Sequence, residues 1–164
     1  MKISSSSLGI IALIVLGLIY GSVFTVGERE LAIKFRFSEI VDSDYVPGLH
    51  FKLPYVNSVE FYPKRLLTII NPQEQFLTKE KKNLYVDFFV KWRITDVATY
   101  YRATGGDANR AASRLLEIVK DGIRAEFAKR TVPEVVSAER REIMADMLTN
   151  ARDNAVQLGI EVVD

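Results

Sequence analysis

The sequence of 164 residues contains no cysteine and a single histidine, His50. The absence of cysteine excludes disulfides, cysteine-ligated zinc, iron–sulfur clusters and a cysteine nucleophile. One isolated histidine is a poor metal ligand, and the sequence places neither a nucleophile nor an orienting acid beside it. We therefore expect a structural or surface role for His50. The sequence predicts no catalytic residue, no cofactor and no metal site.

An excess of charge of either sign is also missing, because 22 Lys and Arg balance 21 Asp and Glu. A near-neutral chain lacks the strongly basic surface that drives non-specific binding to nucleic acid. The composition, 48% hydrophobic and 26% charged, is ordinary for a folded protein. These numbers indicate folded structure and exclude a nucleic-acid partner of the electrostatic kind.

Charge is absent altogether from residues 3–26, and residues 8–24 are apolar on every helical face. About 20 apolar residues in a helix cross a bilayer core of about 30 Å. A cleaved signal peptide is the alternative, but it has a shorter apolar region and a small-x-small exit. The sequence favours an uncleaved signal anchor over residues 1–26. Its expected membrane-embedded side chains are Leu8, Ile10, Ile11, Leu13, Ile14, Val15, Leu16, Leu18, Ile19, Tyr20, Val23 and Phe24.

The charges that flank this run predict its orientation. Lys2 precedes the run, and residues 28–30, which follow it, are net negative. The positive-inside rule then places the N-terminus in the cytoplasm and translocates the body of the chain. The body is neutral and offers no polybasic contact to anionic lipid, so the helix provides the attachment to the bilayer.

Apolar and polar side chains alternate between residue 31 and about residue 94, which predicts half-buried strands. Proline, glycine and asparagine separate the runs at hairpin-sized spacing, which favours an antiparallel sheet. The side chains expected to face the core are Leu31, Ile33, Phe35, Phe37, Leu49, Phe51, Leu53, Leu84, Val86, Phe88, Val90, Trp92 and Ile94.

The period changes to about 3.6 residues after residue 106, which predicts helices. Asp107 is the expected N-cap of a helix that ends near residue 130. Thr131 and Glu134 have the spacing of a capping box, which opens a short second helix.

A third helix is expected over residues 138–158, with Ser137 as N-cap and Gly159 just beyond its end. A new strand begins at Ile160. Strands followed by helices that cover one face predict an α+β fold. We expect an anchor over residues 1–26, a strand-rich lobe over residues 27–98 and a helical lobe over residues 99–164.

Two sets of side chains are candidates for contacts outside the chain. Four aromatic residues could belong to the core or lie at the bilayer interface, where amphipathic rings are favoured: they are Phe51, Tyr55, Phe61 and Tyr62. Charges of both signs surround the apolar stripe of the third helix, as on a solvated helix or on one that packs against a neighbouring subunit. The candidates for a subunit interface are Arg140, Arg141, Asp146 and Arg152.

The N-terminal anchor and several motifs together resemble the stomatin/prohibitin/flotillin/HflK-HflC family, known as the SPFH or band 7 family. The opening motifs are residues 26–29 (Val-Gly-Glu-Arg) and residues 47–54 (Pro-Gly-Leu-His-Phe-Lys-Leu-Pro). Residues 76–82, 91–96 and 100–106 are most similar to HflC-like members. The similarity extends over nearly the whole chain.

The resemblance implies a scaffold and not an enzyme. HflC-like proteins pair with an HflK-like subunit in a large hetero-oligomer on the bacterial inner membrane, which encloses the ATP-dependent protease FtsH and modulates its access to substrates. The body would lie in the periplasm, and a ring of tethered domains would wall off a patch of lipid bilayer. Family members continue into a final strand and a long helical arm, so we expect a truncated product or part of one.

Two other functions stay open at this point. A general lipid-microdomain-organising SPFH protein would need no protease partner. A protease is the second alternative, but the absence of cysteine, the isolated His50 and the lack of a nucleophile elbow speak against it.

Overall fold

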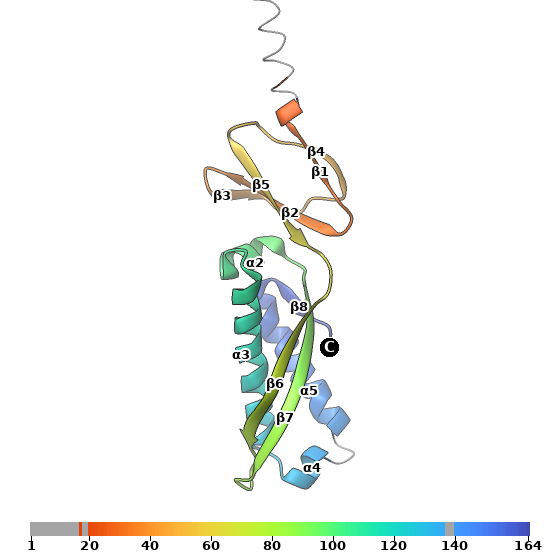
Figure 1. Cartoon of the computed structure of the whole chain (residues 1–164), viewed down its shortest axis with the longest axis vertical. Coiled ribbons are helices and arrows are strands. Elements are labelled where there is room, and N and C mark those ends of the chain that lie inside the picture. The colour runs from red at the N-terminus through yellow and green to blue at the C-terminus, as the bar shows by residue number, and fades with distance from the viewer. Residues whose placement is uncertain (1–16, 18–19, 137–139) are drawn as a thin grey trace, which may run out of the picture. The chain divides into compact units, whose positions relative to one another are not determined.

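The computed structural model describes residue 17, residues 20–136 and residues 140–164, and these residues confirm the α+β fold (Figure 1). They form two compact units: unit 1 ends at Pro63 and unit 2 comprises Lys64–Asp164. The lobe boundary predicted from the sequence lies after residue 98 instead. The difference arises because two long strands pack with the helices of unit 2, as described below.

The described residues of unit 1 form five short strands in two antiparallel sheets. One sheet pairs β1 with β4, and the other has the order β3-β2-β5. The strands are β1 (Val23–Val26), β2 (Glu30–Arg36), β3 (Glu39–Asp42), β4 (Gly48–Phe51) and β5 (Asn57–Pro63). The expected antiparallel pairing is confirmed, but it is divided between two small sheets.

The core of unit 1 begins inside the apolar run that predicts the anchor. Val23 and Phe24, expected in the membrane, lie instead in β1, and Phe24 is only 8% exposed. The Phe24 ring packs edge-on against Tyr45 at 5.3 Å between centroids. A uniformly apolar run can be the end of a membrane helix or a buried strand, and the sequence alone does not distinguish the two. The pairing of Val23–Val26 with β4 identifies these residues as a strand.

Phe37 also departs from its expected place in the core, since its side chain is 82% exposed. Phe37 and Ser38 form the two-residue link between β2 and β3, with φ of 50° and 71°. Hairpin turns of type I′ need positive φ at both central residues. The chain reverses here, so the alternation of β2 stops at Arg36.

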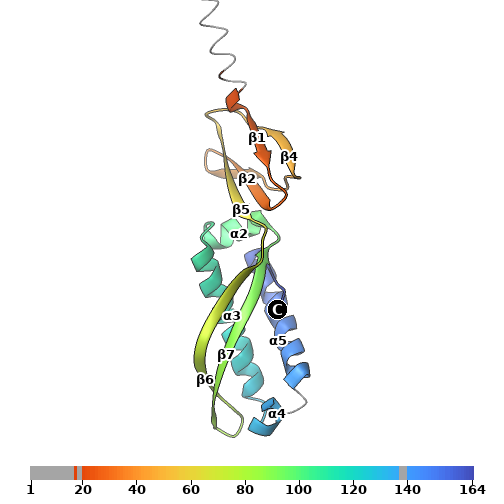
Figure 2. The ribbon, with the colours of Figure 1, turned by 45° about the vertical axis from the view of Figure 1, so that its right-hand side comes forward.

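Unit 2 is a three-stranded antiparallel sheet of order β6-β7-β8, with helices on one side of the β6–β7 hairpin (Figures 1 and 2). The strands are β6 (Leu67–Leu77), β7 (Asn83–Ile94) and β8 (Ile160–Val162). The helices are α2 (Val97–Thr104), α3 (Ala108–Phe127), α4 (Val132–Val136) and α5 (Arg140–Ala155), followed by the 3-10 turn η1 (Val156–Leu158).

The predicted caps of unit 2 are largely confirmed. The Asp107 carboxylate accepts from the backbone N–H of Asn109 at 2.8 Å. Glu134 accepts from the backbone N–H of Thr131 at 2.7 Å, which is one half of the expected capping box. Gly159 lies beyond η1 with φ of 68°. The expected N-cap Ser137 lies outside the described residues.

Helix α2 was missed in the sequence because it is short. Its signal is the N-cap Asp96, which accepts from the backbone N–H groups of Ala98 and Thr99, each at 3.0 Å. Gly105 ends the helix in the left-handed conformation with φ of 68°.

Strand β7 joins the sheet to the helices. The alternation predicted for residues 84–94 is confirmed, since Val90, Trp92 and Ile94 are buried while Tyr85 and Phe89 are exposed. At the other end of the hairpin, a buried cluster of Phe76 on β6 with Ile123 and Phe127 on α3 packs the sheet onto the helix. This burial explains why β6 and β7 belong to the helical unit.

No helix in the described parts of the chain is both long and apolar enough to cross a membrane. The predicted anchor side chains from Leu8 to Ile19 lie outside the described residues.

Candidate functional site

The most distinctive surface of unit 1 is a group of large apolar side chains that face solvent. We call this group the apolar rim. Phe51 is 70% exposed and Tyr55 is 98% exposed. The members of the apolar rim are Tyr20, Val46, Leu49, Phe51, Leu53 and Tyr55. Leu49 and Phe51 share one face of β4, and exposed apolar side chains that lie together mark binding or membrane surfaces.

The pairing of β1 with β4 decides which side chains form the rim. Phe24 on β1 lies opposite His50 on β4, and both face the core. The alternate pairs, which include Val23 with Phe51, therefore face the other way. The alternation in the sequence predicts Leu49 and Phe51 inside. That expectation is wrong, because the inward side of β4 carries the histidine.

His50 has a structural role on this inward side. Its Nε2–H donates to the backbone carbonyl of Val46 at 2.6 Å, a bond that fixes the tautomer because a carbonyl can only accept. Its ring packs against Tyr45 at 4.8 Å and against Phe24 at 5.6 Å between centroids. This hydrogen bond and the ring contacts hold His50 on the inward side of β4, so the apolar side chains of β4 face outward.

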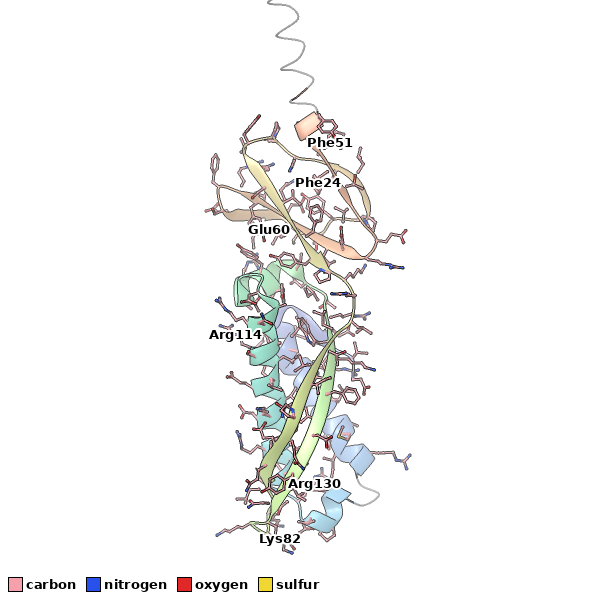
Figure 3. The ribbon with its side chains drawn as sticks, viewed as in Figure 1. Phe24, Phe51, Glu60, Lys82, Arg114 and Arg130 are labelled. Atoms are coloured by element: carbon pink, nitrogen blue, oxygen red, sulfur yellow. The ribbon has the colours of Figure 1, made fainter. Side chains whose placement is uncertain are left out.

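The rim lies beside the residues at which the apolar run ends. The backbone N–H of Lys52 donates to the carbonyl of Ser22 at 2.7 Å. A Cβ placed on Gly21 would lie 3.6 Å from the Cβ of Pro54. Figure 3 shows the Phe51 side chain at this end of unit 1, next to the first residues of the described chain, while Phe24 points between the strands.

The four aromatic candidates fall into two pairs. Phe51 and Tyr55 belong to the rim. Phe61 on β5 contacts the Phe24 ring edge-on at 6.4 Å and is 44% exposed. Tyr62 on the same strand donates to Glu60 at 2.7 Å. Leu49 and Leu53 are exposed although the sequence predicts them in the core. Alternating side chains define the two faces of a strand, but the alternation does not say which face is buried.

The hydroxyl of Tyr45 stays uncharged beside an ion pair. Burial raises the pKa of the Tyr45 hydroxyl, so the phenol stays protonated at physiological pH. Lys34 lies over the Tyr45 ring at 5.3 Å and pairs with Asp42 at 3.7 Å. In the described ranges, no group of three His, Asp or Glu residues could hold a metal ion. The surface is suited to apolar contact.

Comparison with known proteins places this arrangement in a family. The sequence model of the SPFH domain / Band 7 family matches residues 24–164. The chain belongs to the SPFH domain / band 7 family. The match begins at Phe24, the first buried residue of β1.

The curated relatives identify the branch of the SPFH family. The chain is 37% identical over 161 residues to Protein HflC of Haemophilus influenzae, which covers 92% of this chain and 55% of the relative. It is 39% identical over 144 residues to the Modulator of FtsH protease HflC of Escherichia coli K12, which covers 84% of this chain and 43% of the relative. This chain is an HflC-like SPFH protein and spans about half the length of these relatives.

The SPFH motifs have identifiable places in the fold. Residues 47–54 contain β4 and three of the six members of the apolar rim, Leu49, Phe51 and Leu53. Residues 76–82 end β6 and make the turn into β7. In this turn the Thr78 hydroxyl donates to the backbone carbonyl of Lys82 and accepts from the backbone N–H of Lys82. The backbone N–H of Lys79 donates to the carbonyl of Arg130 at 3.0 Å, which ties this turn to the segment that follows α3.

The four candidates for a subunit interface on this SPFH domain behave differently. The Arg140 side chain lies outside the described set. Arg141 is exposed, and Asp146 pairs with Arg130 at 3.5 Å. Arg152 donates to the carbonyls of Val162 at 2.8 Å and Val163 at 3.0 Å. Arg152 therefore holds β8 to α5, which is a role inside the unit.

Proposed function

We propose that this chain is a membrane-anchored scaffold subunit that acts with an HflK-like subunit to modulate an FtsH-type membrane protease. The observation that carries the proposal is the apolar rim beside the end of the apolar run. A helix that ends in this surface would bring Phe51 and Tyr55 to the bilayer interface, where aromatic rings are favoured. Phe61 and Tyr62 on β5 are the further proposed lipid contacts.

The proposed mechanism is compartmentation at a bacterial inner membrane, with the N-terminus in the cytoplasm and the body of the chain after residue 26 in the periplasm. Neighbouring subunits would wall off a patch of bilayer around the protease. Many weak contacts between tethered subunits suffice, because tethering raises their effective concentration. Arg141 on α5 is the proposed subunit contact, since it is exposed while Arg152 bonds within the unit.

The direct test is affinity purification of the tagged chain from polymer-solubilised membranes, followed by mass spectrometry and particle imaging. We expect an HflK-like subunit and an FtsH-type protease to co-purify with it in a large assembly. Recovery of the chain with lipid but with neither protein would contradict the scaffold proposal and favour a general lipid-organising protein.

Topology is tested by fusing a reporter after Arg29, three residues beyond the end of the uncharged run. A reporter that is active only outside the cytoplasm should be active in this fusion. Activity of a cytoplasmic reporter at the same position would refute the proposed orientation.

The proposal also expects no proteolytic activity in the chain itself. Purified chain in detergent should leave casein intact. Cleavage of casein that disappears in the His50→Ala variant would overturn the assignment as a scaffold.

A further inference from the structure

The helices of unit 2 cover one face of the β6–β7 hairpin, and the other face carries large apolar side chains that are exposed (Figures 1 and 2). Ile70 on β6 is 79% exposed and lies directly opposite Phe89 on β7, which is 53% exposed. Tyr85 shares this face, because residues four apart in a strand point the same way. We call Ile70, Tyr85 and Phe89 the sheet face. The alternation of side chains defines it, so it does not depend on what pairs with the edges of the hairpin.

The opposite side of unit 2 is hollowed by a groove of about 390 Å³ between α3 and α5. Its lining residues belong to α3, to the turn that follows α3 and to α5. Since the described strands contribute none of them, the groove opens on the side of the helices that faces away from the sheet. Gly122 and Ala125 keep it open, and a Cβ added to Gly122 would meet nothing within 4 Å. Small residues allow another element to approach closely.

These two surfaces, a projection on one side and a groove on the other, are the features of a head-to-tail contact. Two copies that are joined through unlike surfaces each keep a free surface for a further copy. Such contacts close into a ring when the rotation between the copies permits it. Packing of the sheet face on itself would instead stop at two copies.

Two opposite charges flank Phe89 on the sheet face. Asp87 and Lys91 each lie two residues from it, so they share its side of β7 and are about 13 Å apart along the strand. Two opposite charges also line the groove. Asp121 and Lys129, eight residues apart, are separated by about 12 Å along the axis of α3. The two pairs of charges therefore have nearly the same spacing.

Strand β7 and helix α3 run in opposite directions. Phe127 in the last turn of α3 packs against Phe76, and Phe76 pairs with Leu84 at the start of β7. Helix α3 therefore ends beside the start of β7.

This direction decides how the charges of two copies meet. When both copies keep the same orientation, Asp87 lies toward Lys129 and Lys91 lies toward Asp121. Reversing one copy would bring like charges together, which disfavours the reversed arrangement. The order of the charges thus favours a second copy of this chain, in one orientation, as the occupant of the groove.

The two groove charges also have partners close by in the sequence. Asp121 pairs with Arg124 at 2.7 Å, and Lys129 pairs with Glu126 at 3.0 Å. Because the Asp121 and Lys129 side chains are largely exposed, these ion pairs contribute little to stability, and both charges can interact with a second copy.

We propose that the sheet face of one copy packs into the α3–α5 groove of a second copy in the same orientation, so that copies of this chain join head to tail. A weak contact suffices between copies that share a membrane, because tethering raises their effective concentration. The proposal deepens the proposed scaffold function and rests on it for the role of the assembly. Co-purification of a protease tests that function separately, so the two can fail independently.

Cysteine cross-linking of the full chain in detergent tests the contact, since the native sequence has no cysteine. The Phe89→Cys and Ala125→Cys variants alter exposed positions on the two surfaces and are purified separately. Mild oxidation of their mixture should give a disulfide-linked dimer of the two variants, and neither variant alone should give one. The matched control is a mixture of Phe89→Cys with Ser113→Cys, an exposed position on α3 outside the groove, which should stay monomeric.

A charge reversal tests the orientation. Adding Lys91→Asp to the Phe89→Cys chain should lower the yield of the mixed dimer several-fold, and adding Asp121→Lys to the Ala125→Cys chain should restore it. Thermal unfolding close to that of the parent protein would show that the fold is intact.

Three outcomes would overturn the proposal. The first is a mixture that yields no more dimer than the Ser113→Cys control. The second is efficient cross-linking of Phe89→Cys with itself, which would show that two sheet faces pack together. The third is a yield of mixed dimer that does not respond to the charge reversal or is not restored by its partner substitution.

Discussion

Gly159 is the residue with the least freedom to change in unit 2. It has φ of 68°, and its carbonyl accepts from the backbone N–H groups of Thr95 and Asp96, each at 3.1 Å. A Cβ at this position would collide with the carbonyl oxygen of Asp96 and the backbone nitrogen of Tyr100. Neither is the end of a flexible side chain, so the backbone itself would have to shift.

The Gly159→Ala variant should therefore lose about 3 kcal/mol or more in the free energy of unfolding. Urea denaturation followed by circular dichroism measures this loss. Gly122→Ala is the matched control, because Gly122 lies in α3 with nothing within 4 Å of an added Cβ. It should be neutral or gain up to about 1 kcal/mol. Equal stability of the two variants would refute the proposed collision.

The absence of native cysteine makes the rim accessible to single-site labelling. We expect an environment-sensitive fluorophore on Phe51→Cys, with the chain in vesicles, to report an apolar surrounding. The control is Glu28→Cys, an exposed position just beyond the opposite end of β1 and roughly 15 Å along the strand direction. A blue-shifted emission at position 51 only is the expected result. Identical, water-like emission at both positions would contradict a rim at the bilayer interface.

Alanine variants of Arg141 and Arg152 distinguish an effect on subunit assembly from an effect on the stability of the fold. Arg152→Ala removes two charge-assisted bonds, to Val162 of β8 and to Val163 just after it, and should cost about 1.5–3 kcal/mol of unfolding free energy. Arg141→Ala changes an exposed side chain and should stay within about 0.5 kcal/mol. Only Arg141→Ala should lower the recovery of an HflK-like partner without a change in stability. The reverse outcome would exclude Arg141 as a subunit contact.

At the scale of the element, local signals predicted most boundaries. The N-cap Asp107, the capping box of Thr131 and Glu134 and the left-handed Gly159 lie where the sequence placed them. These signals are reliable because each depends on hydrogen bonds within a few residues. Helix α2 was missed although Asp96 is a typical N-cap, since its eight residues give too little periodicity.

The cap of α2 should make stability depend on pH. Hydrogen bonds from the Thr99 hydroxyl and backbone lower the pKa of Asp96 below its ordinary value of 3.8. A carboxylate with a lowered pKa stabilises the fold above its unfolded pKa, and this contribution is lost as the pH falls through the folded value. Asp96→Ala should cost about 1 kcal/mol at neutral pH.

Urea denaturation at a series of pH values checks this cap. The difference in unfolding free energy between the parent protein and Asp96→Ala should be constant above about pH 5 and shrink below pH 3.8. A difference that stays the same down to pH 2 would show that the carboxylate charge of Asp96 contributes nothing.

At the scale of the whole molecule, the division after Pro63 is the main structural feature. Lys64 and Arg65 are exposed and lie between β5 and β6, outside any strand. Brief trypsin treatment should cleave here first and release unit 2 as a folded fragment, detected by mass spectrometry and circular dichroism. Lys64→Gln with Arg65→Gln should slow this cleavage. An unfolded fragment would show that unit 2 needs unit 1.

The sequence by itself determined the strand and helix periods, most caps, the neutral composition and the family motifs, because these are local or compositional properties. Tertiary structure decided which face of β4 is buried. The ring of His50 packs against the ring of Phe24 in the core, so Leu49 and Phe51 on the opposite face of β4 point outward. It also decided that β6 and β7 pack with the helices of unit 2. Burial joins residues far apart in the chain, so no local pattern could make either choice.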